Sequence, residues 1–313
     1  MQRVSIIITT HNRPRLLSRA VVSARLAGRA AEIVVVDDAS TDETGEVCRS
    51  LQGIRYVRVE RRQGVACARN VGLRASSGEY ISFLDDDDER VPGSLDVQVE
   101  HLDAEPRAAL IYGQALIVGD SGAETRHLYP EHCPRGDIFW ELLGQNFIPC
   151  GSVVFRRSCL TSVGLLDESV PGIDDWDLWI RMAEHFKITA TGQPVYSWRR
   201  SAPGSGQGSS SGARMVRMAV RQFRERWMRL GRAAHAPRST RRAAWHAFSG
   251  RMARHLVWEA VRAHAAGRTR QAAENIFTGL RLLPSAMLSV PFDRHRAHAA
   301  VGLLRGLASA RRA

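Results

Sequence analysis

The N-terminal third of the sequence alternates apolar, strand-like runs with helix-forming stretches. Three runs, VSIIITT, EIVVVDD and YISFL, are almost continuously apolar, and the amphipathic stretches between them include residues 13–26 and 65–75. Continuous apolar runs fit strands that are buried on both faces, as in a parallel sheet with helices on either side. We therefore predict an α/β fold with a mostly parallel sheet.

Polar loops follow three of the predicted strands. TTHNR ends the first strand, DDASTDET ends the second, and LDDDDERVP ends a later one. Because parallel sheets bind ligands beyond the carboxyl ends of their strands, we expect these loops to build one site. Within the second loop, Ser40, Thr41 and Asp42 could instead cap the next helix.

Four consecutive aspartates, Asp85 to Asp88, form the most acidic of these loops. Along an extended segment Asp85 and Asp87 face one way and Asp86 faces the other. Asp85 and Asp87 can bind one divalent cation, Mn²⁺ or Mg²⁺, since hard cations prefer oxygen ligands and keep positions open for phosphate. Without a cation, adjacent carboxylates raise one another's pKa. A solvated acidic loop is the alternative interpretation.

Composition excludes several classes of protein. With 313 residues, of which 44% are apolar, the chain can build a hydrophobic core without stabilising cross-links. The five cysteines show neither paired nor metal-finger spacing, so we expect no disulfide framework and no zinc site. The first apolar run is too short for a secretion signal, and no run reaches the roughly 18 residues of a spanning helix. We expect a cytoplasmic protein, or one that is peripheral on the inner face of the cell membrane.

Charge divides the chain into two parts. Residues 213–313 contain 21 arginines and four acidic residues, a net charge of +17, whereas residues 1–212 carry −5. The Ser/Gly-rich stretch SAPGSGQGSSSGA lies at the change. We predict a domain over residues 1–200, a flexible loop or linker over 201–213, and a basic α-helical region over 214–313. Alternatively, arginine is simply the preferred cation, because the chain has one lysine.

Two patterns occur in the basic region. Residues 214–230, RMVRMAVRQFRERWMRL, place apolar side chains among arginines, so this helix could lie on an anionic membrane or pack on the rest of the protein. Residues 245–284 resemble the second half of a tetratricopeptide-type helix pair, with Gly279 where alanine is usual. No aromatic-interleaved signature of RNA binding is present, and no nucleic acid partner is expected.

Five motifs together resemble one family. VSIIITTHNRPRLL, EIVVVDDASTDET, GVACARNVGL, GEYISFLDDDDERVPGSL and DDWDLWIR occur in the order found in glycosyltransferase family 2, and the resemblance covers residues 4–201. It implies an A-type glycosyltransferase fold with a nucleotide-binding sheet. It also implies a metal-dependent, inverting enzyme that moves a sugar from a nucleoside-diphosphate sugar, with UDP-sugar favoured, to a hydroxyl of a glycan or lipid-linked acceptor. The implied pathway is cell-surface polysaccharide or glycoconjugate biosynthesis.

The resemblance also implies roles for individual residues. They are the nucleotide sugar contacts Thr9, His11, Asp37, Asp38, Arg69, Asn70 and Asp86, the cation ligands Asp85 and Asp87, the catalytic base Asp175, and the acceptor contacts Asp174 and Trp176. Independently, an inverting transfer is a single displacement in which the acceptor hydroxyl must lose a proton, and one carboxylate suffices for this. The aspartates of this segment could instead stabilise the positive end of a helix.

The sequence departs from the family at two positions. His11 replaces an aromatic residue of many relatives, and Ser201 follows YSWRR, where the family often has a histidine that can join the metal site. The sequence therefore does not identify a third protein ligand for the cation. One rival interpretation is a sugar nucleotidyltransferase, although TTHNRPRLL lacks the glycines of a phosphate loop. The other is a catalytically silent module that binds a nucleotide sugar, a membrane or a partner.

Overall fold

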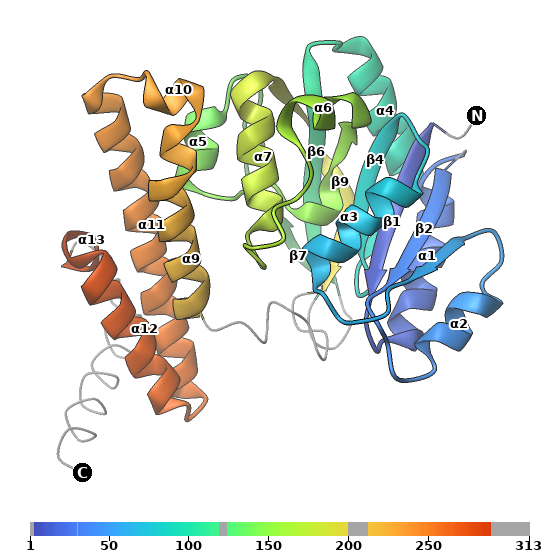
Figure 1. Ribbon diagram of the computed structural model, residues 1–313, viewed down its shortest axis with the longest axis horizontal. Helices are drawn as coiled ribbons and strands as arrows, with labels where there is room; N and C mark the ends of the chain where they lie inside the picture. Colours follow the sequence, from blue (N-terminus) through green and yellow to red (C-terminus); the bar gives the residue numbers. More distant parts are fainter. Residues whose placement is uncertain (1–2, 30, 119–123, 200–211, 289–313) are drawn as a thin grey trace. The chain divides into compact units, whose positions relative to one another are not determined.

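The computed structural model describes residues 3–29, 31–118, 124–199 and 212–288, and it divides the chain into two compact units (Figure 1). The first unit comprises Met1–Leu142 and Asn146–Ser205, and the second comprises Leu143–Gln145 and Gly206–Ala313. Most of the predicted linker, including Ser201, lies outside the described residues. Its last two positions, Gly212 and Ala213, begin a helix and are buried.

The first unit contains one nine-stranded sheet in the order β3-β2-β1-β4-β8-β6-β9-β5, with β7 paired to β6. β3, β2, β1 and β4 are parallel, β8 is antiparallel to both of its neighbours, and β6 and β9 are parallel. The strands are β1 (Val4–Thr10), β2 (Ala31–Asp37), β3 (Arg55–Arg58), β4 (Tyr80–Asp85), β5 (Glu89–Arg90), β6 (Ala108–Val118), β7 (Glu124–Tyr129), β8 (Val154–Arg156) and β9 (Lys187–Arg199). The predicted α/β class with a mostly parallel sheet is confirmed.

Strand β9 lies between two other strands of the sheet. It pairs with β6 over most of its length, and on its other side it pairs with the two residues of β5. The short β5 directly follows the aspartate-rich loop, so this pairing fixes the far end of that loop against β9.

Helices cover both faces of the sheet, because successive side chains of a strand point to opposite sides. Ile6 and Ile8 pack with residues of α1 and α4, whereas Ile7 faces α3. A Cβ on Gly72 of α3 would lie 2.3 Å from Ile7 Cγ2, so this helix needs glycine to approach β1 so closely. The helices are α1 (Pro14–Ala27), α2 (Thr44–Ser50), α3 (Val65–Ala75), α4 (Ser94–Ala104), α5 (Phe139–Gly144), α6 (Leu160–Val163) and α7 (Asp174–His185).

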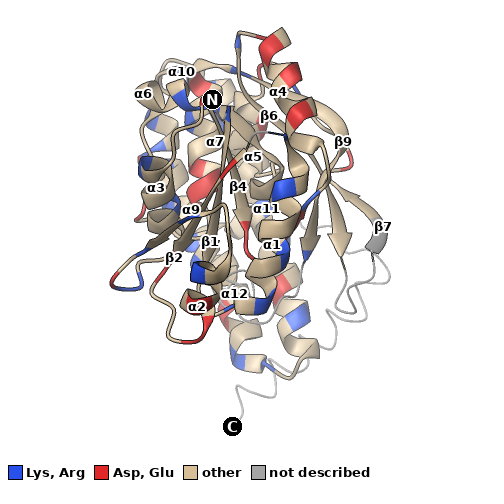
Figure 2. Cartoon of the chain, turned by 90° about the vertical axis from the view of Figure 1, so that its right-hand side faces the viewer, with Lys and Arg blue, Asp and Glu red and all other residues tan. Residues whose placement is uncertain are grey.

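Three strands of the first unit end at the same level. Thr9 of β1 pairs with Val36 of β2 and Asp85 of β4, and Thr10 pairs with Asp37. The loops that follow these strands therefore start side by side, as the sequence predicted. Other acidic residues of the unit are spread over its surface, on α2 and α4 for example (Figure 2).

The second unit is helical. Its elements are α9 (Gly212–Glu225), a 3₁₀ turn (Trp227–Arg229), α10 (Gly231–Ala234), α11 (Arg238–Ala265), α12 (Thr269–Leu282) and α13 (Pro284–Leu288). The apolar residues of α9 are buried inside this unit, and Phe223 stacks on Phe248 of α11 with ring centroids 4.5 Å apart. α11 and α12 pack through Ala260, Ala263 and Ala272. None of the helices described here combines the length and the apolarity that crossing a membrane requires.

Candidate functional site

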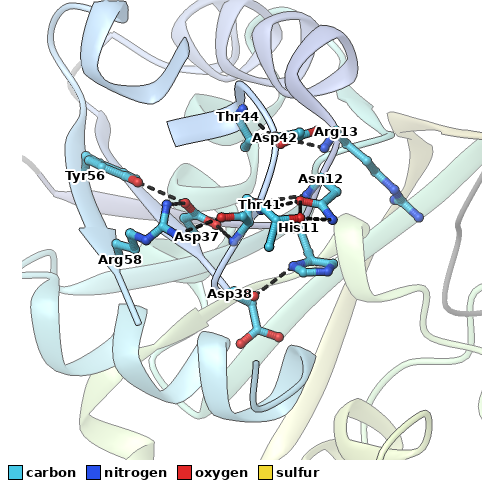
Figure 3. Close-up of polar contacts among 11 residues, drawn as sticks. His11, Asn12, Arg13, Asp37, Asp38, Thr41, Asp42, Thr44, Tyr56 and Arg58 are labelled. Carbon is cyan, nitrogen blue, oxygen red and sulfur yellow. Dashed lines mark hydrogen bonds and ion pairs between the residues drawn. The ribbon is translucent and has the colours of Figure 1, made fainter. Parts of the chain in front are cut away.

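The loops after β1 and β2 are fastened to each other (Figure 3). His11 Nδ1 lies 2.8 Å from the Asp38 carbonyl oxygen, and the Thr41 amide donates to Asn12 Oδ1 at 2.7 Å. Asn12 and Ala39 adopt left-handed backbone conformations, with φ of 55° and 59°. These contacts give the two loops one joint conformation at the edge of the sheet.

Asp37 is buried at the end of β2, and both of its carboxylate oxygens accept hydrogen bonds from neighbouring residues. Oδ1 accepts the Ser40 amide at 2.8 Å, and Oδ2 accepts the Tyr56 hydroxyl at 2.9 Å. Arg58 Nη1 lies 3.3 Å from the same Oδ2 (Figure 3). The structure thus places Asp37 behind the loop, and a direct contact of this residue with a nucleotide stays a prediction.

Asp38 turns the other way and fixes the entry to α3. Its two carboxylate oxygens accept the Gln63 and Gly64 amides, both at 2.8 Å. Gly64 precedes α3 with φ of 93°, a conformation that favours glycine. Asp38 therefore joins the β2 loop to the segment that carries Arg69.

The aspartate-rich loop turns directly after β4. The Asp88 amide donates to the Asp85 carbonyl oxygen at 3.1 Å, and Asp85, Asp87 and Asp88 each place one carboxylate oxygen within 4.8 Å of the other two. Asp86 is buried apart from them and accepts the Thr10 hydroxyl at 2.7 Å. The alternation of an extended strand predicted the first two members of the cluster. It missed Asp88, which the turn brings to the same side.

Burial and mutual repulsion dominate the electrostatics of this cluster. Desolvation, followed by the charges of Asp85 and Asp86, raises the pKa of Asp87 to about 7. Burial and the neighbouring carboxylates raise the pKa of Asp88 well above its usual value. Arg13 offsets part of this charge, because its Nη1 lies 2.8 Å from Asp86 Oδ1 and 3.0 Å from Asp87 Oδ2. Three clustered carboxylates, of which Asp87 and Asp88 have raised pKa values, fit a hard divalent cation.

Arg69 connects this cluster to α7. Its Nη2 donates to Asp85 Oδ1 at 2.8 Å, and its Nη1 donates to Asp174 Oδ2 at 2.9 Å. Its guanidinium also lies over the Phe83 ring, 5.5 Å from the centroid. Arg69 is buried, so it acts as a fixed positive charge between the acidic end of β4 and the acidic start of α7.

Asp175 lies in the first turn of α7 and is partly buried. Its Oδ1 accepts the Trp176 amide at 2.6 Å, and Asn146 Nδ2 lies 3.5 Å from the same oxygen. Burial and the charge of Asp174 raise the pKa of Asp175 to about 7, although Arg69 opposes the shift. A carboxylate with this pKa can accept a proton near neutral pH.

Four other predicted site residues are largely buried. Trp176 donates its Nε1 hydrogen to the Leu142 carbonyl oxygen at 2.7 Å, and Asp174 is held by Arg69. Asn70 exchanges hydrogen bonds with the Leu166 backbone, and Thr9 ends β1 beside Asp85. Acceptor contacts by the first two and nucleotide contacts by the last two stay predictions.

Sequence reasoning assigned no role to three residues of the site. Arg13 follows the first strand within TTHNR, Thr10 ends that strand, and Asn146 lies in the connection before β8. The only sequence signal for the first two was their place in a strand-end loop. Nothing in the sequence pairs Asn146 with Asp175, which lies 29 positions further on.

The mostly parallel sheet, with a cluster of acidic residues at the carboxyl ends of its strands, fits the class predicted from the sequence, the A-type glycosyltransferases. The profile of Glycosyl transferase family 2 matches residues 5–163, half of the chain. The protein belongs to this family.

Curated relatives have similar sequences over part of their length. A Campylobacter jejuni GalNAc(5)-diNAcBac-PP-undecaprenol beta-1,3-glucosyltransferase is 37% identical over 123 residues, 37% of this chain and 39% of the relative. An uncharacterized glycosyltransferase of Rickettsia felis is 31% identical over 187 residues, 57% of this chain. The match spans about a third, 31%, of that Rickettsia protein.

Among solved structures, S. aureus TarS 1-349 in complex with UDP-GlcNAc has a similar fold. The TM-score is 0.64 at 16% identity, and the match covers 97% of this chain and 89% of the TarS chain. This likeness supports the predicted A-type glycosyltransferase fold with an added helical region.

Proposed function

We propose that this protein is a metal-dependent, inverting glycosyltransferase. It would move a sugar from a nucleoside-diphosphate sugar, most simply a UDP-sugar, to a hydroxyl of a glycan or lipid-linked acceptor in cell-surface polysaccharide or glycoconjugate biosynthesis. The observation that carries the proposal is the cluster of Asp85, Asp87 and Asp88, joined by Arg69 to the helix that bears Asp175. The UDP-GlcNAc of the TarS complex and the undecaprenol-linked name of the Campylobacter relative support the choice of substrates.

The donor would lie on the loops at the carboxyl edge of the sheet. Thr9, His11 and Asp38 line the ends of β1 and β2, which is where ligands of parallel sheets bind. Asp37 and Asn70 would act indirectly, because their polar atoms already hold the surrounding loops.

The leaving nucleoside diphosphate gains negative charge, which must be neutralised. Asp85, Asp87 and Asp88 would hold Mn²⁺ or Mg²⁺, which supplies that positive charge when bound. Arg13 contacts Asp86 and Asp87, so its guanidinium lies beside the same site and is available to the diphosphate.

Transfer is a single displacement at the anomeric carbon. The acceptor oxygen forms a bond to this carbon while the bond from the carbon to the diphosphate oxygen breaks, and the electron pair leaves with the diphosphate. The acceptor proton passes to Asp175, whose raised pKa suits a general base near neutral pH. Arg69 limits that rise and so keeps Asp175 available as a carboxylate.

The proposal includes contact of the arginine-rich helical region with an anionic membrane surface, where a lipid-linked acceptor would reside. Residues 212–288 contain 16 arginines and three acidic residues. This segment therefore carries an excess of positive charge, which anionic lipids attract.

Thermal denaturation with nucleotides tests donor binding without a known acceptor. We expect one of UDP, GDP, dTDP and CDP, UDP by preference, to raise the melting temperature in the presence of Mn²⁺, because a ligand that binds only the folded state stabilises it. Asp87→Asn should abolish this shift, whereas Asp175→Asn should retain it.

Slow release of UDP from UDP-sugars, with water as acceptor, then tests the chemistry. Asp175→Asn should lose this turnover by at least about 100-fold, in line with loss of a general base. Full turnover in Asp175→Asn would contradict the assignment of Asp175 as the general base. No shift with any nucleotide would favour the silent binding module instead.

A further inference from the structure

A groove of about 400 Å³ lies in the helical unit, where the end of α9 meets the start of α11. Its polar lining consists of four arginines, Arg224, Arg238, Arg241 and Arg242. Its apolar lining consists of Phe223, Met228 and Trp245, and it contains no acidic side chain. A groove with this lining pairs a concentrated positive charge with an apolar wall.

Within the part of the chain that the structure describes, the groove arginines form no ion pairs. In the described part of the helical unit, the acidic residues pair with arginines outside the groove, as Glu225–Arg221, Glu259–Arg262 and Glu274–Arg217. No ion pair of the four groove arginines occurs among the described residues. Arg224 instead lies over the Trp245 ring, 4.8 Å from its centroid.

Helix α11 adds to the positive potential of the groove. Its first turn contains Arg238 and Arg241, no acidic residue, and no side-chain cap before it. The amino end of a helix is already positive, so arginines there are unfavourable unless an anion lies nearby. An anion in the groove would offset this cost and would meet free amide hydrogens as well as guanidinium groups.

We propose that this groove binds the phosphate headgroup of an anionic lipid at a membrane surface. This inference rests on the proposed membrane contact and names its residues. The arginines would bind the phosphate, while Trp245 and Met228, both partly exposed, would contact the apolar part of the lipid near its headgroup. The apolar face of α9 is buried, so binding would occur at headgroup depth without insertion of that helix.

Vesicle co-sedimentation of the full chain tests the groove. Phosphatidylcholine vesicles that contain phosphatidylglycerol should bind the protein, and pure phosphatidylcholine vesicles should not. The triple variant Arg238→Gln/Arg241→Gln/Arg242→Gln should weaken binding by about 100-fold, because each arginine near the surface contributes about fivefold. The three side chains are exposed and two of them lie at the positive end of α11, so the variant should melt at or slightly above the temperature of the parent protein.

A matched control removes the same charge from outside the groove. Arg268→Gln/Arg270→Gln/Arg281→Gln changes three exposed arginines before and along α12, and it should weaken binding by no more than about threefold, since distant charges are screened. Equal losses in the two triple variants would show diffuse attraction and overturn the proposal. Absence of binding to the anionic vesicles would overturn it too.

A calorimetric titration with inorganic diphosphate distinguishes a lipid headgroup from a soluble anion. Binding of diphosphate at the groove without binding of vesicles would overturn the lipid assignment. The nucleotide-dependent thermal shift, measured on the same variants, should be unchanged in both triple variants. A retained shift without vesicle binding would leave the transferase proposal standing and reject the groove alone.

Discussion

Arg69 Nη1 lies 2.9 Å from Asp174 Oδ2, and the two side chains are 6% and 2% exposed. The second guanidinium nitrogen contacts Asp85 at 2.8 Å. One buried cation thus joins the end of β4 to the start of α7, two elements that bear the proposed cation ligands and the proposed base. The relative position of these two groups depends on this link.

Removal of Arg69 should destabilise the fold strongly. Arg69→Met keeps much of the side-chain volume but leaves Asp174 buried without its counter-charge, which costs about 3–5 kcal/mol in the free energy of unfolding. Asp174→Asn should cost less, because Arg69 retains Asp85 as a partner. Urea denaturation followed by circular dichroism measures both changes.

Arg3 provides the control for this prediction. Its pair with Asp103 is exposed, at 49% and 41%, and Arg3→Met should cost less than about 1 kcal/mol because water screens such pairs. Equal losses for Arg3→Met and Arg69→Met would show that the Arg69 link has no special energetic role.

The charge of the aspartate-rich loop should cost stability when no cation is present. The pKa of Asp87 is raised from 3.8 to about 7. This shift corresponds to a loss of at most about 4 kcal/mol in the free energy of unfolding. Since a raised carboxyl pKa means that the folded state retains its proton longer, this cost is absent below pH 3.8, grows as the pH rises, and is complete above about pH 7.

Asp87→Asn should therefore melt at a higher temperature than the parent protein at pH 8 in EDTA, and the difference should vanish near pH 4. Mn²⁺ should stabilise the parent protein and leave the variant unchanged. Glu100→Gln, which removes an exposed carboxylate of α4, is the control and should have no effect at either pH. A variant less stable than the parent at pH 8 would contradict repulsion as the dominant effect.

Local patterns predicted much of the fold. The helix expected over residues 65–75 occurs as α3, and the apolar runs VSIIITT and YISFL form β1 and most of β4. These elements are predictable because burial on both faces leaves a continuous apolar signal, and because polar residues mark where such strands end. The predicted meeting of three loops at one edge follows from the same parallel topology.

The contacts inside the site depend on three-dimensional structure that the sequence does not encode locally. Arg69 and Asp174 are 105 positions apart, and Asn70 and Leu166 are 96 apart. Asp88 joins the cluster because the chain turns after Asp85, where an extended strand was assumed. Alternation along a strand cannot reveal such a turn, which is why the third acidic residue was missed.

The proposed base predicts how activity depends on pH. Asp175 must be deprotonated to accept the acceptor proton, and its pKa is about 7. Turnover of the donor at saturating Mn²⁺ should therefore rise about tenfold per pH unit below this value and level off above it. His11 also lies at the site, in the loop after β1, so His11→Gln is the control. The rise should persist in His11→Gln and disappear from the residual activity of Asp175→Asn. A rise that disappears in His11→Gln instead would assign the titrating group to the histidine.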